Sequence, residues 1–337
     1  MNFADRFVNV DCTTAGRVTE PAYLSKLRKM PFTAADRRRI AMTCGCRDCE
    51  LLPRADGAGD VFLRDGISVQ KMHDGTLVLA DGYCGQWTTE IIRGLRGFHE
   101  PQEERVFAAV LDALKNPGLI VELGSWWSYY SLSFLRRFPA ARAVLVEPDP
   151  NHLEIGRANF LLNGNNGTFL QAAVAESSRE GIPFPFESTK QTEPLLHISM
   201  DDLAESLKLN EPLDVLLADI QGAETAMLDG MERIARSGLL RFVFVSTHHR
   251  EISGDYRTHE RCLEKLRAMG AHIVAEHTVE ESFSGDGLIV ASFDPAPRLT
   301  VETSRNRHKN SIFGSSEDKI ADVADALEEC RKRQAPA

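Results

Sequence analysis

The stretch Leu119-Ile-Val-Glu-Leu-Gly-Ser-Trp-Trp-Ser-Tyr-Tyr-Ser131 lies in the first half of this 337-residue chain and gives the strongest indication of its fold class. Its first five residues form an apolar run with a single acid, which predicts a buried strand. Gly124 follows directly, and glycine lets the backbone turn sharply and approach a ligand closely. A strand that ends in such a turn is typical of the first strand of a ligand-binding α/β domain.

Similar apolar runs recur along the chain, separated by amphipathic stretches. Apolar residues repeat at helical spacing from Ala223 to Ile234, and another helix is expected to begin near Pro101, because proline tolerates the first helical turn. Strands that alternate with helices form right-handed crossovers, so we expect a doubly wound, mostly parallel sheet. The further predicted strands are Ala143–Val146, Thr168–Gln171, Val215–Leu217 and Phe242–Val245.

The last two strand-like runs are His272–Ala275 and Leu288–Ala291. Only a short loop that contains Gly285, Asp286 and Gly287 separates their neighbourhoods, and no crossover helix fits there. The two strands should therefore pair as antiparallel neighbours. The sheet is expected to finish in an antiparallel strand.

The chain divides into three predicted parts. Residues 1–100 form an N-terminal extension, in which three Asp-Gly pairs predict a small antiparallel meander over Val61–Trp87 that could cover a pocket. Residues 101–300 form the ligand-binding α/β domain. Residues 301–337 form a tail that ends in an amphipathic helix, marked by Ile320, Val323, Ala324 and Leu327.

The overall charge restricts the partners. The net charge is −10, with 49 acids against 39 bases, so an extended nucleic acid would be repelled. No apolar run approaches the roughly 18–20 residues that span a bilayer, which argues against a membrane partner. The first residues lack the layout of a secretory signal, and we expect a cytoplasmic location. The sequence does not determine whether the protein forms a homo-oligomer.

Three of the seven cysteines, Cys44, Cys46 and Cys49, lie within six residues. A structural or incidental role is favoured over a metal site, because metal spacing usually brings a second cysteine pair and none follows. The role of this cluster is left open.

Two glutamates carry the cofactor prediction. Glu122 precedes the Gly124 turn, where its carboxylate could meet a ligand ammonium, and Glu147 ends the second strand, where it is placed to accept ribose hydroxyls. A dinucleotide loop would need the glycines of G-x-G-x-x-G for a pyrophosphate. This loop has one glycine and two tryptophans, which suits a ligand without phosphates such as S-adenosylmethionine.

The chain resembles the FkbM family of S-adenosylmethionine-dependent methyltransferases. The matching motifs are V-E-L-G at 121–124, E-P-D-P-N at 147–151, N-F-L-L-N-G at 159–164, Q-A-A-V at 171–174 and D-V-L-L-A-D-I-Q-G-A-E at 214–224. The resemblance implies a Rossmann-like class I methyltransferase sheet, whose terminal antiparallel strand distinguishes it from dinucleotide-binding sheets.

The resemblance also implies roles for single residues. The methionine end of the cofactor would be lined by Glu122, Gly124, Ser125 and Trp126. Glu147 would hold the ribose, with Pro148 and Asp149 beside it, and Ala172 and Ala173 would flank the adenine. The family commonly has a second glycine where Ser128 stands, and Lys and Glu where Ala218 and Gln221 stand.

Polar residues at the ends of two later strands are the catalytic candidates. Asp219 ends the fourth strand, and His248 and His249 end the fifth. In one version a histidine is the general base and Asp219 orients the substrate or cofactor. In the other, Asp219 and a histidine help to bind a divalent ion such as Mg²⁺. The base version is favoured, because Mg²⁺ prefers oxygen ligands.

The sequence therefore predicts an S-adenosylmethionine-dependent O-methyltransferase that acts on a hydroxyl of a small molecule or sugar. A nicotinamide-dependent oxidoreductase and an inactive binding protein with a methyltransferase fold are the alternatives. The run His99 to Glu104 fits either a segment that reaches the cofactor or an exposed helix start. The acceptor and the metal requirement are not determined by the sequence.

Overall fold

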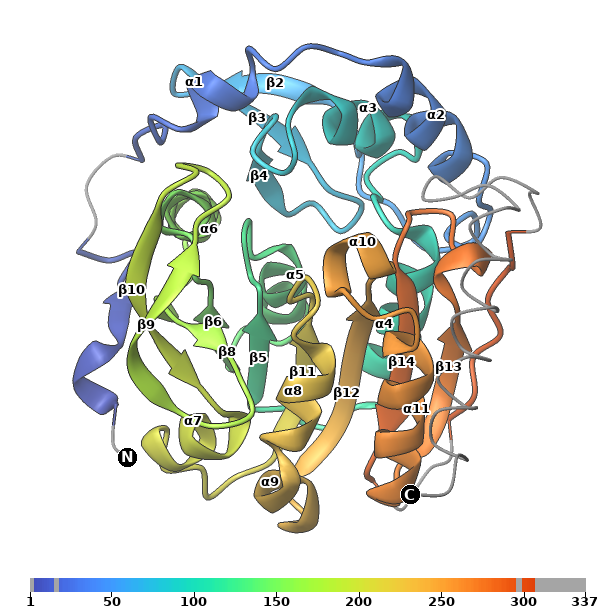
Figure 1. Ribbon diagram of the computed structural model, residues 1–337. Coiled ribbons are helices and arrows are strands. Elements are labelled where there is room, and N and C mark those ends of the chain that lie inside the picture. Colours follow the sequence, from blue (N-terminus) through green and yellow to red (C-terminus); the bar gives the residue numbers. More distant parts are fainter. Residues whose placement is uncertain (1–2, 15–17, 295–298, 307–337) are drawn as a thin grey trace.

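The computed structural model describes residues 3–14, 18–294 and 299–306. Its centre is an eight-stranded sheet in the order β1-β7-β6-β5-β11-β12-β14-β13 (Figure 1). In that order the strands are Val8–Val10, Gly167–Leu170, Arg142–Val146, Leu119–Leu123, Leu213–Ala218, Leu240–Thr247, Gly287–Ser292 and His272–His277. The predicted C-terminal helix lies outside the described residues.

Five neighbouring strands, from β7 to β12, run parallel, as the sequence predicted. β14 is antiparallel to β12 and to β13, which confirms the predicted pairing of the last two strands. The order of the seven strands from β7 to β13, with β14 reversed, is the Rossmann-like sheet of class I methyltransferases. The fold class is confirmed.

Two details of the sheet differ from the prediction that it finishes in an antiparallel strand. β14 is the last strand in the chain, but it lies between β12 and β13 rather than at the edge. All six of its residues are buried, so it is an interior strand with partners on both sides. At the opposite edge β1 pairs antiparallel with β7, so the N-terminal region adds a strand that was not predicted.

Helices cover both faces of the sheet. On one face α4 (Pro101–Ala113), α5 (Tyr129–Arg137) and α6 (Pro150–Leu162) pack against alternate strand residues such as Ile120. On the other face α7 (Met200–Ser206), α8 (Glu224–Asp229), α9 (Glu232–Arg236) and α11 (Thr258–Ala268) pack against Leu119, Val121 and Leu123. The two hydrophobic layers explain why β5 is buried throughout.

The helical pattern from Ala223 to Ile234 forms two helices, α8 and α9, rather than one. Gly230 lies at the break, where a Cβ would come within 2.8 Å of the carbonyl oxygens of Ala175 and Glu176. Its own carbonyl accepts a hydrogen bond of 2.9 Å from the Asp201 N–H. Contact with another segment therefore overrides the local periodicity.

The N-terminal region contains the predicted meander, formed by β2 (Val61–Arg64), β3 (Ile67–Lys71) and β4 (Leu77–Leu79). Asp65 and Gly66 both have positive φ, as a tight hairpin turn requires. The meander ends earlier than predicted, because Trp87 lies in a helix. The other elements here are η1 (Ala4–Arg6), α1 (Leu24–Leu27), α2 (Ala34–Thr43) and α3 (Gln86–Gly94).

Asn159 of α6 and Asn163, the C-cap of that helix, hold the meander in place. Asn159 accepts a hydrogen bond of 2.8 Å from the Leu79 N–H and donates one of 2.8 Å to the Trp127 carbonyl. Asn163 makes both backbone hydrogen bonds of Leu77. The N-terminal elements thus lie over the end of the sheet where α10 (Arg250–Ser253) follows β12 (Figure 1).

The third sheet is also small and lies beside the same end of the central sheet. It is formed by β8 (Ala173–Val174), β10 (Thr192–Ile198) and β9 (Arg179–Pro185). A 3-10 helix, η2 (Val279–Glu281), precedes β14. Within the described ranges, no helix has both the length and the apolar character needed to cross a bilayer.

The turn after β5 gives a test of the fold. Gly124 has φ +72°, and a Cβ there would lie 1.8 Å from the Asp219 carbonyl oxygen, so the ends of β5 and β11 meet only without a side chain. We expect Gly124→Ala to lower the free energy of unfolding by about 2–4 kcal/mol, from the left-handed backbone and the overlap together.

Gly164→Ala is the matched control, since Gly164 has φ +66° and no atom near its Cβ position. It should lose only about 1 kcal/mol in urea unfolding. Equal losses in the two variants would show that β5 and β11 do not approach so closely.

Candidate functional site

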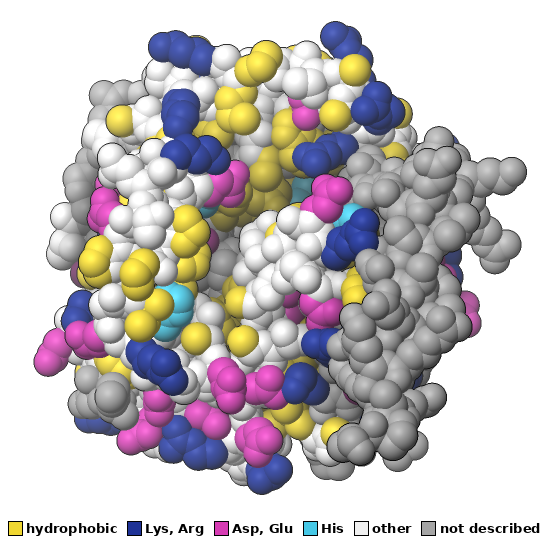
Figure 2. Space-filling model, viewed as in Figure 1, with side chains coloured by type: hydrophobic (Ala, Val, Ile, Leu, Met, Phe, Trp, Pro, Cys, Tyr) yellow, Lys and Arg dark blue, Asp and Glu magenta, His cyan; other side chains and the backbone are white. Residues whose placement is uncertain are grey.

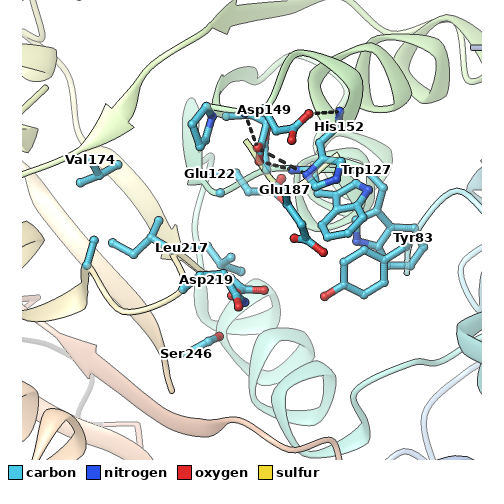
Figure 3. A pocket seen from close by; sticks show the side chains of 18 of the residues that line it. Tyr83, Glu122, Trp127, Asp149, His152, Val174, Glu187, Leu217, Asp219 and Ser246 are labelled. Atoms are coloured by element: carbon cyan, nitrogen blue, oxygen red, sulfur yellow. Dashed lines mark hydrogen bonds and ion pairs between the residues drawn. The ribbon is translucent and has the colours of Figure 1, made fainter. Parts of the chain in front are cut away.

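A cavity of about 480 Å³ opens at the carboxyl ends of β5, β6, β11 and β12. Figure 2 shows the hollow in the middle of this face. In the closer view, Asp219 and Ser246 lie at one end and Asp149 and His152 toward the other, with Tyr83 and Trp127 on one wall (Figure 3). Ligands of open α/β sheets bind at this position.

Most of the predicted cofactor residues line this cavity. They are Glu122, Gly124, Ser125, Trp126, Glu147, Pro148, Asp149, Ala173 and Asp219. Ala172 is fully buried in the core behind the wall. The two histidines at the end of β12 are not part of the lining.

Glu147 joins the loops that follow β5 and β6. One carboxylate oxygen accepts a hydrogen bond of 3.0 Å from the Trp126 N–H, and the other accepts one of 2.9 Å from the Asp149 N–H. The side chain is buried but lines the cavity. Because each carboxylate oxygen can accept more than one hydrogen bond, the group keeps capacity for a ligand hydroxyl.

The loop after β5 is held by stacking and by close packing. The indole of Trp126 stacks on the His152 ring with centroids 3.5 Å apart, and its N–H donates to the Gly82 carbonyl. Ser128 has φ +60°, which explains why a glycine would suit this position. A Cβ on Gly156 of α6 would lie 2.4 Å from the Ser128 hydroxyl.

Asp149 fixes the far wall. It caps α6 by accepting from the Asn151 N–H, and it also accepts from the N–H and hydroxyl of Ser188 at 2.8 and 2.6 Å. Burial would raise the pKa of Asp149, but His152 and these hydrogen bonds lower it. Asp149 thus anchors the β9–β10 hairpin, whose Phe184 and its neighbours Pro185 and Glu187 line the cavity.

Glu122 lies on the cavity floor and is 3% exposed. It accepts a hydrogen bond of 2.9 Å from the Ser131 N–H, while burial raises its pKa to about 7. The nearby Ser125 hydroxyl is buried and has no hydrogen-bond partner among the described residues. These groups leave both an acceptor and a free hydroxyl for the polar end of a ligand.

His248 lies behind the cavity wall, between carboxylates. Its Nδ1 is 2.6 Å from a Glu224 oxygen, and its Nε2 is 3.1 Å from an Asp219 oxygen. Burial would lower the pKa of His248, but the surrounding acids, Asp286 and Asp219 foremost, raise it well above its ordinary value. The ring is buried and has a carboxylate oxygen near each nitrogen, which suits it to holding Asp219.

Asp219 itself reaches the cavity, with a quarter of its side chain exposed. Burial would raise its pKa, but its hydrogen bond and attraction to His248 lower it, so the carboxylate is ionised. His249 lies elsewhere, at the N-terminus of α10, where its Nδ1 accepts from the Glu251 N–H. The structure therefore brings Asp219 and His248 together and leaves His249 outside the lining.

A second group of polar residues in the lining was left open by the sequence. His99 is buried and lies 3.2 Å from a Glu100 oxygen and 3.4 Å from a Glu104 oxygen. Burial would lower the pKa of His99, but these carboxylates raise it to about 10. Of the run His99 to Glu104, the residues that line the cavity are His99, Glu100 and Glu103. The sequence did not point to Tyr83, Cys84 or Ser246, which also line the cavity.

No cluster of three or more potential metal ligands occurs in the described part of the chain. Cys46 and Cys49 are buried, Cys44 is half-buried, and the Cys49 thiol donates to the Pro101 carbonyl. Burial raises the pKa of all three thiols. This environment fits a packing role.

No protein-family model and no curated protein sequence matches the chain. Solved structures do resemble it. The precorrin-6y C5,15-methyltransferase of Geobacter metallireducens GS-15 is 15% identical, with a TM-score of 0.35, over 55% of this chain and 87% of that one.

Two further structures are similar at the same level. The O-methyltransferase of Bacillus cereus, solved with SAH, is 15% identical with a TM-score of 0.37, over 57% and 80% of the two chains. The ribosomal protein L11 methylase of Lactobacillus delbrueckii subsp. bulgaricus is 11% identical with a TM-score of 0.35, over 58% and 81%. Similarity this distant does not identify a substrate, and the FkbM resemblance stays a prediction.

The buried carboxyl of Glu122 gives a pH test. Its pKa of about 7 exceeds its ordinary 4.5, so between these values the folded protein keeps a proton that the unfolded chain releases. Stability from this group is therefore lost as the pH rises through the window. Glu122→Gln cannot ionise and should gain about 2–3 kcal/mol relative to the parent protein between pH 5 and pH 8.

Urea unfolding at the two pH values measures this gain. Glu90→Gln is the control, because the Glu90 side chain is 42% exposed and should show no such change. A difference for Glu122→Gln that stays constant with pH would mean that this carboxyl is already ionised in the folded protein.

Proposed function

We propose that the protein is an S-adenosylmethionine-dependent methyltransferase that methylates a hydroxyl group of a small molecule or glycan. One observation carries the proposal: Glu147 and Glu122, at the ends of neighbouring strands, and Asp219, on the next strand, all face one cavity. This is the arrangement needed to grip a nucleoside, an amino acid and an acceptor hydroxyl in that order.

The lining fits the cofactor on chemical grounds. Glu147 has acceptor capacity for ribose hydroxyls, and Glu122 offers a carboxylate to an ammonium. The unpartnered Ser125 hydroxyl would donate to a carboxylate of the ligand. Apolar walls from Ala173 and Phe184 suit an adenine ring. When bound, S-adenosylmethionine supplies an electrophilic methyl group.

The chain's own residues supply positioning and a proton acceptor. Asp219 would accept the hydrogen bond of the acceptor hydroxyl and would take its proton when the oxygen–methyl bond forms and the sulfur–methyl bond breaks, which would leave S-adenosylhomocysteine. His248 keeps that carboxylate oriented and ionised. The rings of Tyr83 and Trp127, brought in by the N-terminal elements and the β5 loop, exclude water from this side. Alignment of the reacting groups is the main contribution.

Cofactor binding is tested by calorimetry with S-adenosylhomocysteine. Glu147→Ala should weaken binding by about 10–100-fold, since a hydrogen bond to a charged group is worth about 1.5–3 kcal/mol. Glu154→Ala, on the exposed face of α6, should leave the affinity unchanged. NAD serves as the comparison ligand, and circular dichroism checks the fold of each variant.

An unchanged affinity in folded Glu147→Ala would rule out the proposed ribose contact. Tighter binding of NAD than of S-adenosylhomocysteine would favour the oxidoreductase instead.

The proton acceptor is tested by turnover. Asp219→Asn should lower kcat by about 10²–10⁴-fold, the usual contribution of a positioned base. His248→Gln should shift the acidic limb of the kcat profile to higher pH, because the imidazolium no longer lowers the pKa of Asp219.

A merely structural His248 would change stability without moving the pH profile, which would contradict its role in holding Asp219. Activity that is abolished by EDTA and restored by Mg²⁺ would replace the base role of Asp219 with metal binding.

A further inference from the structure

A smaller compartment of about 200 Å³ continues the cavity beyond Asp219. The two spaces share Tyr83, Cys84, His99, Glu100 and Gln221 as lining residues. The far wall of the smaller one is formed by α2, α3 and the loop before β14. In the strand order, this compartment lies on the β12 and β14 side of β11, whereas Glu147 lies at the end of β6 on the other side. A ligand in the compartment would therefore not overlap an adenosyl group bound at Glu147.

The shared end of the two spaces is rich in carboxylates. Glu100, Glu103 and Asp219 line the main cavity, and Asp286 lines the smaller compartment. These carboxyl groups interact electrostatically. Burial, followed by repulsion from Glu100 and Asp219, raises the pKa of Glu103 well above its ordinary value. Burial raises the pKa of Asp286 to about 7, with Asp219 contributing.

The two histidines at this end of the cavity are already paired with carboxylates. The His99 ring lies between Glu100 and Glu104, and the His248 ring between Asp219 and Glu224. No lysine or arginine occurs among the described residues that line the main cavity. Arg39, at the smaller compartment, lies over the Trp87 ring at 5.2 Å.

Glu103 has a buried carboxylate oxygen that is available to a ligand donor. The residue is 6% exposed and lines the cavity. One carboxylate oxygen accepts a hydrogen bond of 3.1 Å from the Ser246 hydroxyl, but the other is buried without a hydrogen-bond partner among the described residues. A buried polar atom without a partner is costly, and a donor on a ligand would remove that cost.

Aromatic rings complete the surroundings. Tyr83 and Trp127 stack with centroids 4.7 Å apart and both line the main cavity, as does Tyr130. The faces of such rings attract cations, and alkylated ammonium groups in particular. Carboxylates and aromatic rings together are the surroundings that bind amines.

We propose that this end of the cavity binds a positively charged amino group, so that the acceptor is an amino alcohol or an amino sugar. Its ammonium lies against Glu103 and Glu100, and its hydroxyl faces Asp219. This inference rests on the proposed function and narrows its substrate class. The amino group is a binding handle and the hydroxyl is the group that is methylated.

The test is calorimetry on the full chain saturated with S-adenosylhomocysteine, using matched probe pairs. Choline, tyramine and glucosamine are each compared with a neutral counterpart: 3,3-dimethylbutanol, 4-propylphenol and glucose. At least one cationic probe should bind about tenfold or more tightly than its counterpart. The ammonium of tyramine or glucosamine would donate a charged hydrogen bond, whereas choline, which has no N–H, would bind through its charge and cation–π contact.

Glu103→Gln should reduce this preference to less than about threefold, because the amide cannot ionise beside the bound ammonium but keeps an acceptor for Ser246. Glu50→Gln is the control, since the Glu50 side chain is 58% exposed, and it should keep the full preference. Thermal melting confirms that both variants fold.

Several outcomes overturn the inference while S-adenosylhomocysteine still binds. These are equal binding within every pair, no binding by any cationic probe, or a preference that persists in folded Glu103→Gln. Binding of Mg²⁺ alone that Glu103→Gln abolishes would make these carboxylates metal ligands and also overturns it. Failure of S-adenosylhomocysteine to bind the parent protein would instead overturn the proposed function.

Discussion

The carboxylate of Glu147 is the interaction on which the cavity depends. It accepts the backbone N–H groups of Trp126 and Asp149 and so joins the loops that follow two neighbouring strands. Each loop then fixes a wall: Trp126 stacks on His152, and Asp149 holds Ser188 beside the β9–β10 hairpin. A single buried acid thus sets the positions of the groups that would contact a nucleoside, and it still has acceptor capacity for the ligand.

The central sheet could be predicted because its strands are buried on both faces. Runs such as Leu119–Leu123 are apolar apart from one acid, and Gly124 allows both the positive φ and the close approach to β11 at the turn. Asp219 and Glu147 could be placed at the cavity because the carboxyl ends of parallel strands meet at one edge. Their positions at the ends of predicted strands were enough to place these two residues at the cavity, without knowledge of the tertiary contacts.

Other features depend on contacts that a linear pattern does not contain. β1 has only three residues and is stabilised by pairing with β7, and β9 is largely exposed. From the sequence alone, the acids after His99 are equally compatible with an exposed helix start. They become part of the site only because α4 packs beside β12, where Ser246 meets Glu103. His249 is adjacent to His248 in sequence, but the chain turns into α10 between them and separates their roles.

The most direct measurement is a crystal structure of the protein soaked with S-adenosylhomocysteine. We expect density in the 480 Å³ cavity, with the ribose hydroxyls on Glu147, the amino group near Glu122 and the sulfur directed toward Asp219. A ligand bound outside this cavity, or bound in it with the ribose away from Glu147, would show that Glu147 is not the ribose-binding residue.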